Sequence, residues 1–417
     1  MIKKILIGFC LFLSAVTWAQ EGTSSPYSFY GIGDIKFKGT VENRSMGGVS
    51  VFNDSIHVNL QNPASFSHLK FTTFTVGANY NNVKLETESQ SEKATRTTID
   101  YLVVAMPISK KFGASLGLLP FSSVGYKIQN VNADPTQTSS RYFGEGGVNR
   151  LFGGLGYKFN DNFSIGADIN YNFGNISTTA VDYIPEVQYG TRELNESRLN
   201  GVNYNFGMMY NRKVTEKLTV FGSLAYSPES NMNIDNERNI TTVLVAANFN
   251  FVPQDEGITQ LSTSKLKLPS KFVLGAGIGE VRKWAVGAEL TMQQSSSFGN
   301  RFNDIDNVEY ENSTKFSFGG YFIPKYNSFN KYLERVTYRA GFNYENTGLI
   351  INNKAINNYG ITFGLGLPLG GSFSNINVGV EYGKRGTIYS GLVEENYTNI
   401  FISLSLNDRW FVKRKYE

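Results

Sequence analysis

Phe163-Ser164-Ile165-Gly166-Ala167-Asp168-Ile169-Asn170-Tyr171-Asn172-Phe173 is the stretch of sequence that decides the fold. Its odd positions carry apolar residues, and its even positions carry small or polar ones. Because successive side chains of a β-strand point to opposite faces, one face of this strand is apolar and the other hydrophilic. A tilted strand needs about 9–11 residues to cross a bilayer, so this stretch predicts a membrane-spanning strand.

The alternation recurs along the chain, for example from Val336 to Tyr344 and from Ile400 to Leu406. We predict strands at 70–82, 97–108, 111–125, 147–159, 162–175, 198–212, 217–243, 265–280, 283–295, 313–324, 334–348, 357–369, 375–386 and 396–407. Short and long connections alternate between them, which is typical of outer-membrane barrels. The sequence thus predicts an all-β fold, a 14-stranded antiparallel transmembrane β-barrel. An even strand number places both termini in the periplasm.

The two ends of the chain carry other signals. Lys3 and Lys4, an apolar run and the Thr17-Trp18-Ala19 cleavage pattern predict a signal peptide at 1–19. An anchor helix is the alternative, but the run is too short to span a bilayer. Cys10 lies mid-run behind Phe9, which disfavours a lipoprotein. We assign 70–411 to the barrel and 412–417 to a basic tail, and we expect the aromatic chain end to be recognised by the barrel-assembly machinery.

Composition excludes several classes of protein. The chain has 39 Lys+Arg against 35 Asp+Glu, a net charge of +4, and its basic run is confined to 413–415, so nucleic acid is not an expected partner. A soluble β-sandwich or solenoid is disfavoured by the signal peptide and by aromatic residues near strand ends. His57 and His68 are the only histidines, and no strand carries one. We therefore predict no enzyme, no cofactor and no metal site.

Residues 20–69 do not alternate, and a barrel of fourteen strands has a lumen too wide for its own side chains to fill. We expect this segment to form a plug, or hatch, inside the lumen. It ends near Asn62-Pro63-Ala64. Pro63 fixes its own φ and restricts Asn62, which predicts a turn. The turn either locks the hatch and starts the first strand, or moves to gate a path.

This order of elements resembles the FadL/TodX family of outer-membrane transporters for long-chain fatty acids and hydrocarbons. Family members have a small N-terminal hatch ending near Asn-Pro-Ala, then fourteen strands. Asn62-Pro63-Ala64 matches that motif, the stretch from Arg44 to Val51 is similar to a hatch stretch, and Leu266-Lys-Leu-Pro269 is similar to a Leu-Pro strand of the family. The resemblance covers the layout of the whole mature chain.

Two predicted strands break the alternation and suggest a lumen pocket. From Ile99 to Pro107 and from Leu116 to Phe121, apolar residues fall on both faces. The candidate pocket residues are Leu102, Val104, Met106, Leu119 and Phe121. Pro120 favours a bulge or kink. Since the resemblance implies an inward kink that opens a lateral gap, Pro120 and Gly117 are candidates for it. Alternatively, all these residues pack against the plug.

Basic residues predicted in the lumen could bind the carboxylate of a ligand, as the resemblance implies. The candidates are Lys267, Lys271 and Arg339. The alternative is a polar, solvated interior in which these residues have no ligand.

Two functions follow for a protein of the cell outer membrane, surrounded by its lipid. The leading hypothesis is passive uptake of hydrophobic compounds such as long-chain fatty acids. The alternative is a non-transporting barrel that acts as an accessory or shuttle subunit in protein secretion or envelope assembly, with envelope proteins as partners.

Overall fold

The structure is a computed structural model that describes residues 22–245, 251–299, 301, 307–370 and 373–409. The predicted signal peptide at 1–19 and the tail at 412–417 lie outside the described residues. Within these ranges, no helix is long and apolar enough to cross a membrane.

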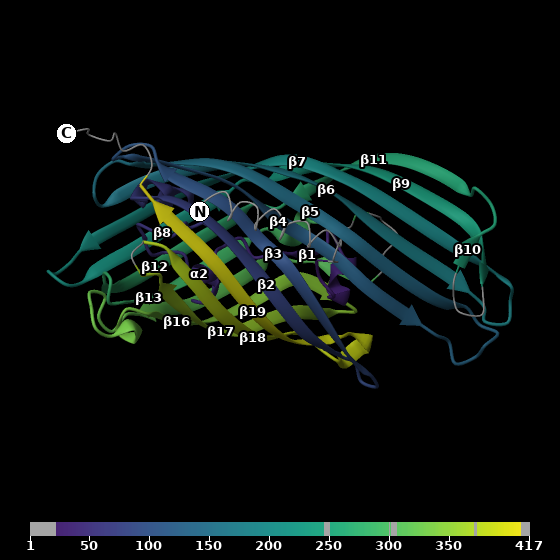
Figure 1. The fold of residues 1–417 in the computed structure, drawn as a ribbon. Helices are drawn as coiled ribbons and strands as arrows, with labels where there is room; N and C mark the ends of the chain where they lie inside the picture. The colour runs from purple at the N-terminus through teal and green to yellow at the C-terminus, as the bar shows by residue number, and fades with distance from the viewer. Residues whose placement is uncertain (1–21, 246–250, 300, 302–306, 371–372, 410–417) are drawn as a thin grey trace, which may run out of the picture.

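Fourteen antiparallel strands form a closed barrel, as predicted (Figure 1). They are β2 (Thr72–Glu86), β3 (Ser91–Pro107), β4 (Phe112–Asn130), β5 (Ser139–Lys158), β6 (Phe163–Tyr183), β7 (Tyr189–Lys213), β8 (Thr219–Ser227) continued by β9 (Ser230–Val245), β11 (Ile258–Leu268) continued by β12 (Lys271–Glu280), β13 (Trp284–Gln293), β15 (Ser313–Phe322), β16 (Thr337–Ile351), β17 (Lys354–Pro368), β18 (Asn375–Gly386) and β19 (Glu394–Asp408). β19 pairs with β2 from Asp408↔Thr72 to Glu394↔Glu86, which closes the barrel.

The remaining elements are short. They are η1 (Pro26–Phe29), β1 (Asp34–Ile35), α2 (Val41–Arg44), η2 (Pro63–His68), β10 (Phe251–Pro253), η3 (Ser295–Ser297), β14 (Val308–Tyr310), η4 (Tyr332–Glu334) and η5 (Tyr389–Gly391). The first four belong to residues 22–71, which we call the inner segment.

Apolar residues face outward and polar residues face inward along the strands. On β6, Ile169 is 50% exposed whereas Asn170 is fully buried. Aromatic rings gather at the end of the barrel with short turns, where Phe112 stacks obliquely on Tyr157 with ring centroids 4.6 Å apart. Such an apolar belt with interfacial aromatics is the surface that lipid requires.

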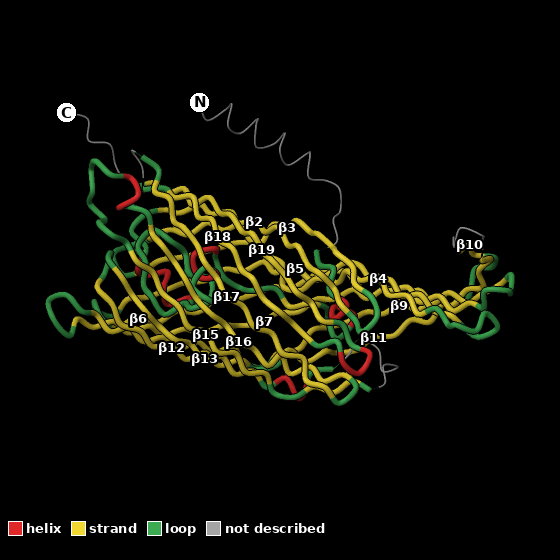
Figure 2. The backbone as a smooth tube through the Cα atoms, turned by 90° about the horizontal axis from the view of Figure 1, so that it is seen from below, coloured by secondary structure: helices red, strands yellow, loops and turns green. Residues whose placement is uncertain are grey.

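The wall is much taller on one side (Figure 2). β7 has 25 residues, whereas β15 has 10. The strand β8/β9 is interrupted at Pro228, and the strand β11/β12 is interrupted beside it at Pro269. Beyond these prolines, β9 and β11 continue together with β7 and separate from β13. We call the outer parts of β4 to β7, β9 and β11 the projecting sheet. Its polar residues lie on both faces, which is why alternation predicted strands that were too short there.

The neighbouring strands β3 and β4 part halfway along their length. They pair only from Leu102↔Leu118 to Pro107↔Gly113. A bulge marks the parting in each strand, since Asp100 has no partner in β2 and Phe121 has none in β5. The inner segment pairs with the freed edge of β4 through β1, in the register Asp34↔Ser123 and Ile35↔Ser122. Two further bonds extend this contact, from Lys36 N to Phe121 O at 2.9 Å and from Gly125 N to Ser28 Oγ at 3.2 Å.

Candidate functional site

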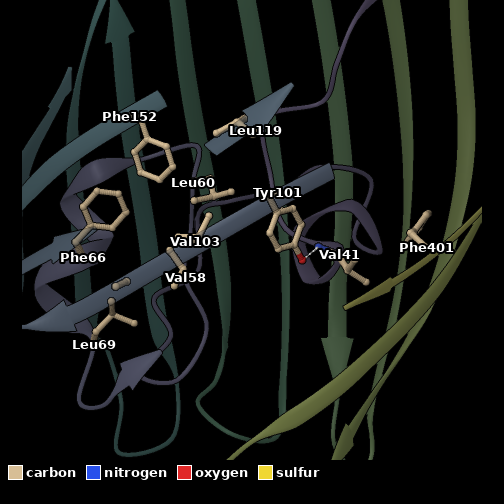
Figure 3. Close-up of a cluster of buried hydrophobic side chains, with 11 residues drawn as sticks. Val41, Val58, Leu60, Phe66, Leu69, Tyr101, Val103, Leu119, Phe152 and Phe401 are labelled. Carbon is tan, nitrogen blue, oxygen red and sulfur yellow. Dashed lines mark hydrogen bonds between the residues drawn. The ribbon is translucent and has the colours of Figure 1, made fainter. Parts of the chain in front are cut away.

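The inner segment packs against the inward face of the wall through an apolar cluster (Figure 3). Val41, Val58, Leu60, Phe66 and Leu69 come from the inner segment, and Tyr101, Val103, Leu119, Phe152 and Phe401 come from the wall. Tyr101 also accepts a hydrogen bond at its hydroxyl oxygen from Val41 N, at 3.2 Å. Burial of this cluster contributes the apolar part of the attachment.

Rows of glycine form the floor on which the inner segment lies. Gly113, Gly156, Gly166 and Gly207 are register partners across β4, β5, β6 and β7. A Cβ at Gly166 would lie 2.5 Å from Ala64 N, and one at Gly156 would lie 2.7 Å from Ser67 N. A second row includes Gly319 and Gly341 on β15 and β16, against Met46 and Gly47. The wall thus omits side chains where the backbone of the inner segment approaches it.

Asn62-Pro63-Ala64 lies over the first glycine row, at the start of η2. The Asn62 side chain accepts a hydrogen bond from Ala64 N at 3.1 Å, which caps η2. Its amide nitrogen donates to Met208 O at 3.1 Å and to Leu224 O at 3.2 Å, on β7 and β8. The motif therefore joins a turn of the inner segment to two wall strands, an arrangement that supports the locking role.

Ion pairs and charge-assisted hydrogen bonds complete the attachment. Arg44 contacts Glu381 through Nε at 3.1 Å and through its terminal nitrogen at 3.0 Å, and it reaches Asp100 at 3.3 Å. Ser50 donates to Glu289 from both its backbone N, at 3.0 Å, and its hydroxyl, at 2.8 Å. These contacts stabilise the attachment, because a buried charged group that loses its partner raises the free energy of the folded state.

Three more ion pairs involve the start of the inner segment, and two of them join it to the wall. Asp34 contacts Arg385 at 2.7 Å and Lys36 at 3.1 Å. Burial alone would raise the pKa of Asp34, but Lys36 and Arg385 outweigh it and hold the pKa at about 2. Lys38 reaches Asp168 at 3.4 Å, and burial lowers the pKa of Lys38 although Asp168 opposes that shift.

A chamber of about 500 Å³ is enclosed by residues of the inner segment and of the wall. Its charged lining comprises eight cations, Lys36, Lys38, Arg44, Arg96, Arg150, Lys271, Lys315 and Arg385, and six carboxylates, Asp34, Asp100, Glu289, Glu345, Glu381 and Glu395. Ligand pockets for hydrophobic compounds are mostly apolar with few polar groups, and this chamber is not of that kind.

The prediction that Leu102, Val104 and Met106 line a lumen pocket is wrong. Tyr101, Val103 and Ala105 point inward instead, and Leu102 is 40% exposed on the outward face. The cause is the bulge at Asp100, because one unpaired residue reverses which positions of a strand face inward. The apolar run on both faces reflects lipid on one side and the inner segment on the other.

The candidate pocket and kink residues on β4 lie in different surroundings. Leu119 is buried in the cluster with the inner segment. Gly117 faces inward where a Cβ would meet Leu102 O at 2.7 Å, so it serves close packing. Pro120 and Phe121 line the chamber at the bulge, and Arg150 lies over the Phe121 ring at 4.0 Å.

The three basic candidates do not form one site. Lys271 lines the chamber. Lys267 lies on the outward face, paired with Glu229 at 3.3 Å and 52% exposed, so its predicted lumen position is wrong. Its neighbours Leu266 and Leu268 point inward, which reverses the assumed face. Arg339 is buried against Asn377 at 3.1 Å and does not line the chamber.

Several residues of the site were not predicted from the sequence. Arg44, Lys38 and Arg385 each join the inner segment to the wall. Arg150 was not predicted because glycines and asparagines surround it in the sequence. Alternation nevertheless indicates its inward position, since its neighbours Asn149 and Leu151 face outward. Charges at inward positions of alternating strands were the available signal.

The closed fourteen-stranded wall and its packed inner segment define the class of protein: an outer-membrane β-barrel with the fold of FadL/TodX structures. The chain belongs to the BamG family, whose sequence profile matches residues 1–417. Comparison with curated proteins gave no match.

Solved structures confirm the expected resemblance in fold. The Ralstonia pickettii toluene transporter TbuX is 13% identical with a TM-score of 0.63, over 89% of this chain and 99% of that one. A Pseudomonas aeruginosa FadL homologue is 14% identical with a TM-score of 0.60, over 90% and 98%. The Pseudomonas putida toluene transporter TodX is 15% identical with a TM-score of 0.60, over 90% and 100%. Two of these three structures are toluene transporters.

Proposed function

We propose that this protein is a sealed outer-membrane barrel that acts as an accessory subunit of the barrel-assembly machinery. The observation that carries the proposal is membership of the BamG family over the whole chain, since that family is named for this machinery. Among the two functions considered from the sequence, this is the envelope-assembly role.

The attachment of the inner segment supports the same function. Its backbone lies on glycine rows, and Arg44, Asn62 and Ser50 join it to several wall strands. Opening a path would expose the partners of these groups together, and each buried charge left unpaired costs several kcal/mol. The charged chamber also offers little to a hydrophobic solute.

Orientation in the membrane is part of the proposal. Outer-membrane barrels have short periplasmic turns and longer outer loops. We therefore place the short turns and both termini in the periplasm, and the projecting sheet on the cell surface. The domain limits we propose are a signal peptide at 1–19, a hatch at 20–69, a barrel at 70–411 and a tail at 412–417.

The test separates assembly from passage through the lumen. Thr291 lines the chamber, so Thr291→Trp would occupy part of it and narrow it, and Leu290→Trp on the adjacent outward position is the matched control. Cells depleted of this protein should lose folded outer-membrane barrels, and both variants should restore them. The tagged chain should also co-purify from mild detergent with the subunit of the machinery that inserts barrels. Normal barrel assembly in depleted cells, with no such co-purification, would refute the proposal.

Uptake of hydrophobic compounds is the second candidate, and the parting of β3 and β4 favours it. The wall strands lack mutual pairing there, and the similar solved structures include toluene transporters. On this reading, Thr291→Trp lowers uptake of toluene or a long-chain fatty acid while Leu290→Trp does not. Equal uptake by wild type, Thr291→Trp and cells without the protein would exclude this candidate.

A further inference from the structure

The outer part of β11 is a strand edge without a partner. β9 is the strand that pairs with β11, from Ile258↔Ile240 to Leu268↔Ser230, and no other pairing of β11 occurs within the described residues. Residues 258–265 are all exposed, including Leu261 at 78%. An exposed edge presents unpaired N–H and C=O groups to any other extended chain.

This edge lacks the features by which proteins protect such strands. Charged side chains, proline and bulges usually block pairing at a free edge. From Ile258 to Ser264 the sequence is Ile-Thr-Gln-Leu-Ser-Thr-Ser, with no charge and no proline, and the pairing with β9 has no bulge. The outer half of β3 is a useful contrast, because its freed edge from Ser91 to Asp100 carries Glu92, Lys93 and Arg96. The chain thus protects the free edge of β3 with charges and leaves the edge of β11 without them.

One row of side chains on the outward face beside this edge is acidic. One register row runs Glu145–Ser177–Glu196–Glu237–Leu261 across β5, β6, β7, β9 and β11. Glu196 and Glu237 are direct cross-strand partners, both exposed, and like charges in that position destabilise a sheet. None of the three glutamates has an ion pair within the described part of the chain. In the next row, Arg198 and Asp235 offset each other.

We propose that β11 is a docking edge for an extended segment of a partner protein, which adds a strand to the projecting sheet and carries Lys or Arg toward the glutamate row. An added strand would lie about 5 Å from β11 and about 10 Å from β9. The Debye length is about 8 Å at physiological ionic strength, and Lys or Arg side chains that extend across β11 would bring their charges within that distance of Glu237. An apolar residue of that segment would cover Leu261. Backbone bonds would supply affinity, and the basic residues would set register and discriminate against acidic chains.

Hydrogen exchange provides the first test. Those amides of 258–265 that point away from β9 should exchange at least about tenfold more slowly in native outer membranes than in the purified full-length protein, because the added strand protects them. Amides at the tips of the short turns should exchange equally in both samples. Equal exchange at 258–265 would overturn the proposal.

Cross-linking in cells tests the chemistry of the partner. A photo-reactive amino acid in place of Leu261 should join one segment, identified by mass spectrometry, that has more Lys and Arg than Asp and Glu. Glu196→Lys combined with Glu237→Lys should reduce this product by about 10- to 30-fold, whereas Glu216→Lys in a short turn should not. Proline at Ser262 and proline at Thr263 should reduce the yield of this cross-linked product to different extents, because successive N–H groups point to opposite sides of the strand. A product with an acidic segment, with a second copy of this chain or with lipid alone would refute the assignment.

Discussion

Gly166→Ala should loosen the inner segment without weakening the wall. The added Cβ would lie 2.5 Å from Ala64 N, well inside the distance of about 3.5 Å at which such atoms pack. The three nearest atoms all belong to the backbone of Pro63 and Ala64 in η2, so they cannot rotate away as a side chain could. We expect overpacking of about 1–3 kcal/mol. In the strand itself, alanine is more favourable than glycine by about 0.5–1 kcal/mol.

The chain supplies a matched control on the neighbouring strand. Gly153 on β5 has nothing within 4 Å of an added Cβ, so Gly153→Ala changes propensity alone. Hydrogen exchange of η2, where Ser65 N donates to Asn62 O at 3.2 Å, measures the attachment. A loss of about 2 kcal/mol should speed exchange there by about 30-fold in Gly166→Ala and leave β6 unchanged. Identical η2 exchange in the two variants would refute the view that the glycine rows are a floor for the inner segment.

Three further perturbations address the polar attachment. Arg44→Met should cost about 3 kcal/mol, since it leaves the carboxylate of Glu381 buried without its partner, and exchange of α2 amides should rise accordingly. Asn62→Ala removes three hydrogen bonds and should cost about 2–3 kcal/mol, measured as faster exchange of η2. Burial alone would lower the pKa of His57, but Asp54 at 2.7 Å outweighs it and raises the pKa above its usual value. The stability that this pair contributes is therefore fully present below about pH 6.5 and is lost as the pH rises through the raised pKa. Protection of the amides of 54–58 from exchange should fall at alkaline pH. His57→Gln should abolish this pH dependence.

Exposed positions provide controls for these variants. Arg212→Met and Asn160→Ala, both near short turns, should leave the exchange of α2 and η2 unchanged. Restoring charge balance with Glu381→Gln should recover part of the loss in Arg44→Met. If the double variant is as loose as the sum of the two single ones, Arg44 and Glu381 do not act as a pair.

Alternation predicted the barrel because lipid on one side and water or polar groups on the other impose a period of two on each spanning strand. The strand from Phe163 to Phe173 obeys this rule fully, and so the number of strands was predictable. The rule fails where that contrast ends. The outer part of β7 has polar residues on both faces, and the predicted strand began at 198 although β7 starts at Tyr189.

The candidate site was harder to predict, for a physical reason. A bulge such as that at Asp100 depends on the pairing of neighbouring strands, which a local pattern does not contain, and it reversed the assignment of Leu102, Val104 and Met106. Asn62-Pro63-Ala64 was recognisable because a turn is a local feature. The partners of Asn62, Met208 and Leu224, are more than a hundred residues away and contribute backbone oxygens, which no sequence pattern marks.

Through β1, the inner segment pairs with β4 at positions where β3 no longer pairs with it. If Asp34 and Ile35 left their places, β4 would offer a bare template beside the outer rim of the apolar belt. Another extended chain could then take the vacated register at Ser122 and Ser123. Removal of the inner segment would thus exchange one strand for another. The rate at which the protein opens would then depend on the concentration of an extended chain that can pair with β4.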